Sequence, residues 1–265
     1  MSQAWVVYLV GADRSGWRIL MLLGALPAVL TFFIRIFVPE SEKWRTAARG
    51  APKARVADIF VPGLARRTVL ATCLGAIALL GTWGSVQWVP SWADKLSNQL
   101  AGARAWTQIS SSIGAIIGTV LAAQLAQWFS RRLAYFGLAV GSLAVCAYLF
   151  WSPIWLPRLF ESSLEYGPHF LITAGVVGGL TASFYGWLPL YLPELFPTRV
   201  RATGQGFAFN MGRVLAAGGT LLSGQLLNAF GEDYAAMCRV ISLVYVFGLV
   251  VIWFCPETKG KPLPE

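Results

Sequence analysis

Charged residues are scarce in this chain. Of its 265 residues, 12% are Asp, Glu, Lys or Arg, whereas 56% are hydrophobic. Soluble domains are about one quarter charged, and a soluble fold of this composition would lack the polar side chains needed to cover its surface. The composition therefore excludes the soluble classes of protein, soluble enzymes included, and predicts an integral membrane protein.

Residues that commonly carry chemistry are also few. The chain has one histidine, and its four cysteines form no CxxC pair and no metal-ligand spacing. Neither HExxH nor GxSxG occurs, and no acid lies within a long apolar run. We therefore expect no enzyme activity, no cofactor and no metal site. His169 is expected at the outer membrane surface, and the cysteines are expected to be buried as small hydrophobic residues; they are Cys73, Cys146, Cys238 and Cys255.

Seven apolar runs are long enough to cross a bilayer, which takes about 20 residues. Backbone groups in lipid must be satisfied within the segment, so each run is predicted to be a helix, and the short alternating strands of a barrel are excluded. A shorter run at 3–11 makes about half a crossing. The predicted spans are 17–38, 68–90, 105–129, 133–151, 169–192, 203–229 and 234–255.

The basic residues lie between these runs. The loops on one side carry thirteen Lys and Arg, and those on the other side carry four. An excess of this kind marks the cytoplasmic side, so the C-terminus is predicted to be cytoplasmic in a cell (plasma or inner) membrane. The net charge of +9 then reflects orientation, and we expect no nucleic-acid partner.

Glycines recur at four-residue spacing in three successive spans. The pairs are Gly114 and Gly118, Gly137 and Gly141, and Gly175 and Gly179. Because glycine lets helix backbones approach closely, these pairs predict a tightly packed bundle.

Two predicted spans end in the same way. One is followed by Pro39-Glu40-Ser41 and the last by Pro256-Glu257-Thr258, with six predicted spans from one to the other. A six-span repeat implies a parent with two six-span halves. Only one and a half spans precede the first Pro-Glu, so we expect the chain to be a fragment or a truncated reading frame.

These exits, together with the run Pro193-Glu194-Leu195-Phe196-Pro197-Thr198-Arg199 and its continuation to Gly204, resemble the major facilitator superfamily near its sugar porters and organic-acid symporters. The resemblance implies an all-α membrane bundle that corresponds to helices 6 to 12 and the tail of helix 5. The implied divisions are an N-terminal remnant at 1–38, a basic linker at 39–67, a six-helix half at 68–255 and a tail at 256–265. Helix 7 lacks the Gln pair of the sugar porters, and the loop at 127–132 retains only the final basic pair of its usual motif.

A charge near the bilayer centre is a functional candidate because it is costly to hold there. Arg213 lies ten residues after Thr203, about 15 Å along a helix, and Asn210 precedes it by about one turn. We expect the two to bind an anionic or hydroxylated solute in a central cavity. The alternative is a structural bridge between two helices.

Other polar and aromatic side chains within the spans are weaker candidates. Amides can bind neutral solutes, and indole rings can stack on sugars and rings; packing between helices is the alternative for each. Two prolines near the inner end of the predicted span at 169–192, Pro189 and Pro193, are expected to form a hinge. The further cavity candidates are Gln87, Gln108, Trp83 and Trp187.

A cytoplasmic gate is implied by the resemblance. In that family an ion-pair network holds the inner gate closed in the outward-facing state, and solvated loop charges are the alternative reading here. Glu40 is expected to belong to the matching network of the first half. The residues expected in the gate of this half are Glu194, Arg201, Arg131, Arg132 and Glu257.

The sequence as a whole predicts a secondary transporter that moves a small polar solute, such as a sugar or organic acid, by alternating access. The intact parent is expected to be ion-coupled, and its partners are the solute, membrane lipid and the missing N-terminal half. A truncated, non-transporting membrane protein or sensor is the alternative.

Overall fold

The computed structural model describes residues 16–38, 54–155 and 165–264. The half-span predicted at 3–11, Glu40 and most of the linker lie outside these residues. The chain forms two compact units, Met1–Lys53 and Ala54–Glu265, which are described separately.

The described part of the first unit is one helix, α2 (Gly16–Phe37), which matches the span predicted at 17–38. Pro27 lies inside it, and the hydroxyl of Thr31 donates to the Pro27 carbonyl oxygen at 2.9 Å. Large apolar side chains such as Leu22 and Phe37 are more than two-thirds exposed. This surface is suited to lipid or to other protein.

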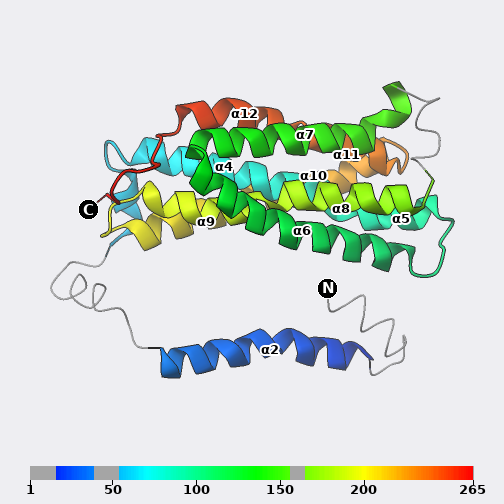
Figure 1. The fold of residues 1–265 in the computed structure, drawn as a ribbon, viewed down its shortest axis with the longest axis horizontal. Coiled ribbons are helices and arrows are strands. Elements are labelled where there is room, and N and C mark those ends of the chain that lie inside the picture. The colour runs from blue at the N-terminus through cyan, green and yellow to red at the C-terminus, as the bar shows by residue number, and fades with distance from the viewer. Residues whose placement is uncertain (1–15, 39–53, 156–164, 265) are drawn as a thin grey trace. The chain divides into compact units, whose positions relative to one another are not determined.

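The second unit is a bundle of helices without described strands (Figure 1). Its elements in chain order are η1 (Val56–Phe60), α4 (Ala65–Gly84), η2 (Val86–Trp88), α5 (Val89–Leu96), α6 (Ala103–Trp128), α7 (Arg131–Trp155), α8 (Pro168–Ala182), α9 (Phe184–Glu194), α10 (Arg201–Ala229), α11 (Tyr234–Ser242) and α12 (Val244–Phe254).

Every predicted span of this unit is helical, and five segments are long and apolar enough to cross a membrane. They are Ala65–Leu96, Ala103–Trp128, Arg131–Trp151, Pro168–Glu194 and Tyr234–Phe254. The helix α10 coincides with the span predicted at 203–229, but its Gly, Asn, Gln and Arg residues make it less apolar than these five. The all-α membrane bundle predicted from the sequence is confirmed.

Three spans predicted as continuous helices are interrupted, and a serine lies at or next to each interruption. The hydroxyl of Ser85, between α4 and η2, donates to the Gly81 carbonyl oxygen, and that of Ser183, between α8 and α9, donates to the Gly179 carbonyl oxygen. Ser242 precedes the α11–α12 junction and donates to the Arg239 carbonyl oxygen at 2.8 Å. Hydroxyls that bond to the preceding turn can bend a helix, but Thr72 and Thr220 make the same bond inside the unbroken helices α4 and α10, so the serines permit these breaks rather than cause them.

Two helix pairs make the most extensive contacts, α6 with α8 and α4 with α10, and α12 packs against both α7 and α4 (Figure 1). At the α6–α8 seam, a methyl group on Gly114 would overlap the carbonyl of Gly175, and one on Gly118 would overlap that of Gly179. These two pairs confirm the predicted close approach of helix backbones. The third pair does not take part, because Gly137 has open space beside it and Gly141 faces only Leu180.

The core between the pairs is rich in aromatic residues. The Tyr135 ring lies 4.9 Å from that of Phe184 and 4.8 Å from that of Trp187, and Trp187 is 4.5 Å from Tyr191. All four are fully buried. Of the cysteines, Cys146, Cys238 and Cys255 are buried as predicted, whereas Cys73 is only partly buried.

The α6–α8 seam yields a paired prediction. Gly118→Ala places a methyl group on backbone atoms of Gly179, which cannot move aside as a side chain can, so we expect a loss of about 1–3 kcal/mol in unfolding free energy. Gly137→Ala, with nothing within 4 Å, should be neutral or stabilising by up to about 1 kcal/mol. Unfolding in detergent measures both; equal effects would contradict a backbone seam.

Candidate functional site

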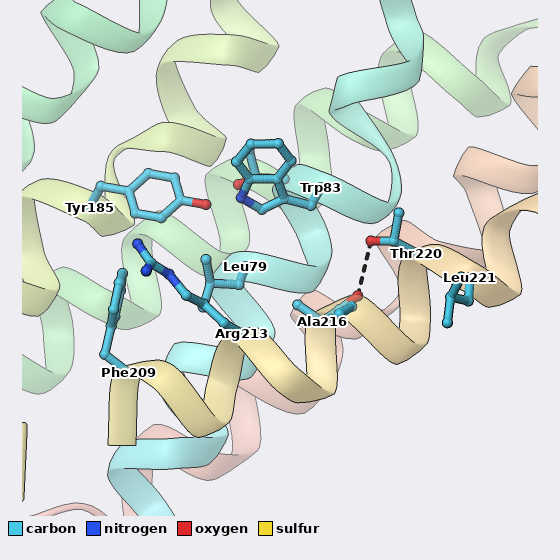
Figure 2. Close-up of a pocket in the computed structure, with 10 residues that line it drawn as sticks. Leu79, Trp83, Tyr185, Phe209, Arg213, Ala216, Thr220 and Leu221 are labelled. Atoms are coloured by element: carbon cyan, nitrogen blue, oxygen red, sulfur yellow. Dashed lines mark hydrogen bonds between the residues drawn. The ribbon is translucent and has the colours of Figure 1, made fainter. Parts of the chain in front are cut away.

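A cavity of about 770 Å³ opens between α4, α9 and α10 (Figure 2). Its wall is largely apolar, with a guanidinium, a phenol, an indole and two threonine hydroxyls as its polar groups. The lining residues are Leu79, Thr82, Trp83, Tyr185, Phe209, Arg213, Ala216, Ala217, Thr220 and Leu221. An apolar hollow with a few converging polar groups is the usual form of a small-molecule site.

Arg213 supplies the only charge among these lining residues. It lies on α10 one turn after Phe209, and its guanidinium carbon is 4.8 Å from the centre of the Phe209 ring, a cation–π arrangement. No ion pair joins Arg213 to a carboxylate in the described part of the chain. The guanidinium is directed toward Tyr185 (Figure 2) and can receive an anion.

Trp83 and Arg213 are the two predicted binding residues that the cavity brings together. Asn210 instead donates from its side-chain amide to the Gly206 carbonyl oxygen of its own helix at 2.8 Å. Gln87 is exposed in η2, and Gln108 donates to the Ser112 hydroxyl at 3.3 Å. None of these three amides lines the cavity.

Trp187 also lies outside the cavity. It is fully buried between aromatic rings, and its indole N–H donates to the Arg131 carbonyl oxygen at 3.1 Å. The expectation that it lines a solute cavity is therefore corrected, because its hydrogen bond and its burial make it part of the core that supports α7. The sequence offered no way to distinguish it from Trp83, since both are tryptophans within apolar spans.

Tyr185 and Phe209 were not among the predicted candidates. The position of Phe209, four residues before Arg213, places it beside the guanidinium on one helix face and could have indicated it. Tyr185 has no such local signal, because its place in the cavity depends on how α9 packs against α4 and α10.

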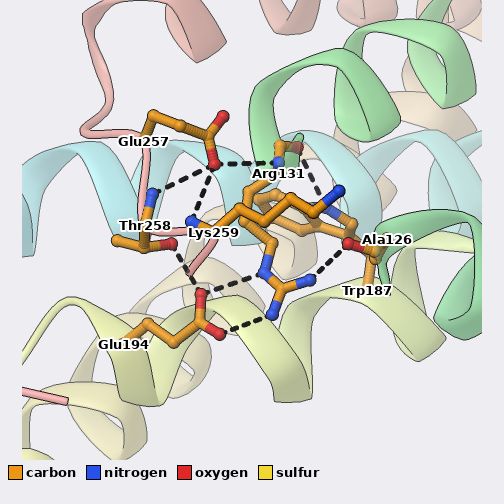
Figure 3. A network of polar contacts seen from close by, with 7 residues as sticks. All are labelled: Ala126, Arg131, Trp187, Glu194, Glu257, Thr258 and Lys259. Atoms are coloured by element: carbon orange, nitrogen blue, oxygen red, sulfur yellow. Dashed lines mark hydrogen bonds and ion pairs between the residues drawn. The ribbon is translucent and has the colours of Figure 1, made fainter. Parts of the chain in front are cut away.

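A polar cluster lies where α9 ends and α7 begins (Figure 3). Arg131 donates from Nη2 to Oε1 of Glu194 at 2.7 Å and from Nε to Oε2 at 3.0 Å, a two-pronged ion pair. The Thr258 hydroxyl donates to Oε2 of the same carboxylate at 2.6 Å. The two charged side chains are only 13% and 17% exposed, so this pair is shielded from solvent.

Glu257 belongs to the same cluster and meets the start of α7. Its carboxylate accepts the backbone N–H groups of Arg131 and Arg132 at 3.0 and 3.1 Å, and also those of Thr258 and Lys259. Burial raises the pKa of Glu257, but these N–H donors outweigh it and hold the pKa below its ordinary value. A carboxylate at a helix N-terminus also gains from the helix dipole.

Arg201 is not part of this ion-pair network. Its Nε donates to the carbonyl oxygens of Pro193 and Phe196 at 3.1 and 3.2 Å, and Nη2 donates to that of Pro264 at 2.9 Å. Arg132 joins the cluster only through its backbone, and its buried Nε has no hydrogen-bond partner among the described residues. The expected ion-pair role of these two arginines is corrected accordingly.

Pro189 and Pro193 lie inside α9, whereas the interruption of the span falls earlier, at Ser183. Glu40 lies outside the described residues. Among the described residues, no three His, Cys, Asp or Glu are grouped to hold a metal ion.

Residues 91–265 match the family described as "Sugar (and other) transporter". The chain belongs to this family, within the major facilitator superfamily. It is thus a multi-pass membrane protein, and the family and its relatives are described as transporters rather than enzymes, as the sequence predicted.

Several relatives are named for small organic molecules. The chain is 30% identical to a probable 4-methylmuconolactone transporter of Cupriavidus pinatubonensis, covering 93% of this chain and 55% of the relative. It is 26% identical to a cis,cis-muconate transport protein of Acinetobacter baylyi (93% and 59%) and 25% identical to a 3-(3-hydroxy-phenyl)propionate transporter of Escherichia coli (91% and 56%). The chain thus spans a little more than half the length of each of these relatives.

The shielded ion pair yields a stability prediction. Glu194→Gln removes the carboxylate that is paired with the buried Arg131 guanidinium and leaves Glu257, which is not within ion-pair distance, as its acidic neighbour. We therefore expect a loss of about 3 kcal/mol in unfolding free energy. Glu232→Gln removes a carboxylate that is 74% exposed in its pair with Lys95, and should cost less than about 1 kcal/mol. Denaturant unfolding in detergent compares the two variants; equal losses would show that the Arg131 pair is no stronger than a surface pair.

The lowered pKa of Glu257 yields a pH prediction. A carboxylate whose folded-state pKa lies below its unfolded value stabilises the fold above the unfolded pKa, and this contribution is lost as pH falls through the folded pKa. The melting temperature of Glu257→Gln should therefore lie below wild type at pH 6, and the difference should shrink below about pH 4. Gly137→Ala, which changes no charge, should differ from wild type equally at both pH values. A Glu257→Gln difference that persists at low pH would contradict this account.

Proposed function

We propose that the protein is a secondary transporter that moves a small organic anion across the membrane by alternating access. The observation that carries this proposal is Arg213, a cation in an apolar-walled cavity with no carboxylate partner in the described chain. Retaining a charge in an apolar segment is expensive, and an anionic solute would offset that cost.

The walls of the cavity favour a solute with an apolar or aromatic body. Trp83 and Phe209 present rings beside the guanidinium, and Leu79 adds an aliphatic surface. A neutral sugar needs several hydrogen-bonding groups around it, yet the predicted amides of Gln87 and Gln108 lie elsewhere. The relatives named for muconate and hydroxyphenylpropionate transport support the same choice of an organic acid.

The polar cluster around Glu194 is proposed as the cytoplasmic gate of this half. It joins α9, α7 and the C-terminal tail at one end of the bundle, where the basic loops predict the cytoplasmic side. All the described partners of Glu194 come from its own unit, so the cluster would act by fixing the shape of this end. If the cluster is the gate, Glu194→Gln should loosen it. Cysteines placed at inner-loop positions should then react faster with an impermeant reagent added from the cytoplasmic side, and unchanged labelling would contradict a gating role.

Pro189 and Pro193 are proposed as the hinge of α9. Each lacks the N–H that would bond to the preceding turn, and both lie between the cavity and the cluster. The seven predicted spans contain no Asp or Glu, so they contribute no titrating carboxylate to the proposed ion coupling.

The test of the anion proposal uses two substitutions. Arg213→Lys retains the charge but loses the planar fork that grips a carboxylate, and Arg213→Gln loses the charge. Both should weaken the binding of benzoate and cis,cis-muconate, Gln by more, and by about tenfold to a hundredfold because a charged hydrogen bond is worth about 1.5–3 kcal/mol. Arg104→Gln, at an exposed ion pair outside the cavity, is the matched control.

Binding is measured per folded molecule, by calorimetry on purified protein expressed from its native reading frame. A neutral-sugar site would bind glucose and tolerate Gln better than Lys. A purely structural Arg213 would show less folded protein but normal carboxylate affinity in the remainder, and that result would remove Arg213 from the binding site.

A further inference from the structure

The hydroxyl of Tyr185 is a polar group without a structural task. Its oxygen is buried and makes no hydrogen bond of ordinary geometry with any described residue, although the side chains of Thr82 and Trp83 lie close to it. Leaving a buried hydroxyl unpaired is costly, and native structures rarely do so without a reason. The ring extends from α9 into the cavity, with the hydroxyl pointing toward Trp83 (Figure 2).

The other hydroxyls that line the cavity are already engaged. Thr82 donates to the Ala78 carbonyl oxygen at 2.9 Å and lies 3.4 Å from that of Thr181, and Thr220 donates to the Ala216 carbonyl oxygen at 2.9 Å. A threonine hydroxyl that donates to a carbonyl of its own helix has no second donor for a solute. Tyr185 is therefore the lining hydroxyl with its donor free.

The free hydroxyl and the guanidinium lie on different helices. Tyr185 belongs to α9 and Arg213 to α10, and both face the same hollow beside the Trp83 ring (Figure 2). A solute carboxylate on Arg213 would leave its ring or chain along Trp83 and Phe209. A second polar atom on that body could then reach the Tyr185 hydroxyl.

We propose that Tyr185 determines specificity by hydrogen bonding to a second polar group, a hydroxyl or a carbonyl, on the body of a carboxylate solute. This inference rests on the proposed function, because it takes the Arg213 cavity as the binding site. It goes beyond that function by dividing organic acids into two classes. Acids with a second hydrogen-bonding group satisfy Tyr185, and acids without one leave its hydroxyl unpaired.

The experiment compares Tyr185→Phe with wild type on a panel of probes. The probes are benzoate, its 3- and 4-hydroxy derivatives and its 3- and 4-formyl derivatives, and binding is measured by calorimetry on protein expressed from its native reading frame. Wild type should bind at least one derivative more tightly than benzoate, by about five- to tenfold, which is the net value of one hydrogen bond. Tyr185→Phe should abolish that preference, measured as the ratio of the derivative's affinity to that of benzoate within each protein. Tyr234→Phe, outside the cavity, should behave as wild type.

A second readout excludes a structural role. Because the hydroxyl is unpaired, Tyr185→Phe should melt at the wild-type temperature or above it without ligand; a clear drop would show that the hydroxyl has a structural partner and would overturn the proposal. A preference that survives in Tyr185→Phe, or the absence of any preference in wild type, would also overturn it.

The proposed function fails in a distinguishable way. If Arg213→Gln leaves benzoate binding unchanged while Tyr185→Phe still abolishes the preference, then the anion assignment of Arg213 is wrong and that of Tyr185 stands. If no carboxylate in the panel binds, then both assignments are wrong.

Discussion

The backbone groups that helices leave unpaired at their ends organise one end of this bundle. At the end of the bundle where α6, α9 and α12 finish, basic side chains take up carbonyls that the helices leave unpaired. Arg66 donates to Phe254 of α12, Arg67 to Leu195 after α9, and Lys259 to Trp128 of α6. Glu257 does the reverse at the start of α7, where it accepts free N–H groups. The cations thus lie at helix C-termini and the carboxylate at an N-terminus, as the helix dipole favours. Because Glu257 and Lys259 belong to the C-terminal tail, these contacts fix the tail to the bundle.

The spans could be predicted from the sequence because the length and apolarity of a run are local properties. The scarcity of charged residues in each run can likewise be seen without knowing how the helices pack. The interruptions at Ser85, Ser183 and Leu243 could not, since a serine in an apolar run is compatible with a straight helix or a bent one. Packing decides between the two. The same limit applies to the glycine pairs: three pairs of equal spacing predicted a tightly packed bundle, and only the pairs at 114/118 and 175/179 face each other.

The site shows the same division between local and tertiary information. Arg213 could be identified because a charge in an apolar helix is costly wherever it points. The family resemblance placed both Arg201 and Arg131 with Glu194, but Arg201 reaches nearby carbonyls, while Arg131 approaches the carboxylate with the geometry of a two-pronged pair. Trp187 and Tyr185 are two residues apart on α9, yet Trp187 lies in the core and Tyr185 lines the cavity. Only the packing of α9 separates them.

The helix α9 connects the two regions to which we assign function. Tyr185 lines the cavity and Glu194 ends the helix nine residues later, about 13 Å along its axis. Between them, Pro189 lacks the N–H that would bond to the Tyr185 carbonyl, so the turn that presents Tyr185 is the one whose helical hydrogen bonding is weakened. A bend there would move Tyr185 relative to Arg213. A solute that bridges Tyr185 and Arg213 would then favour one bend over the other by its contacts alone, which is the differential binding that any solute-driven change of state requires.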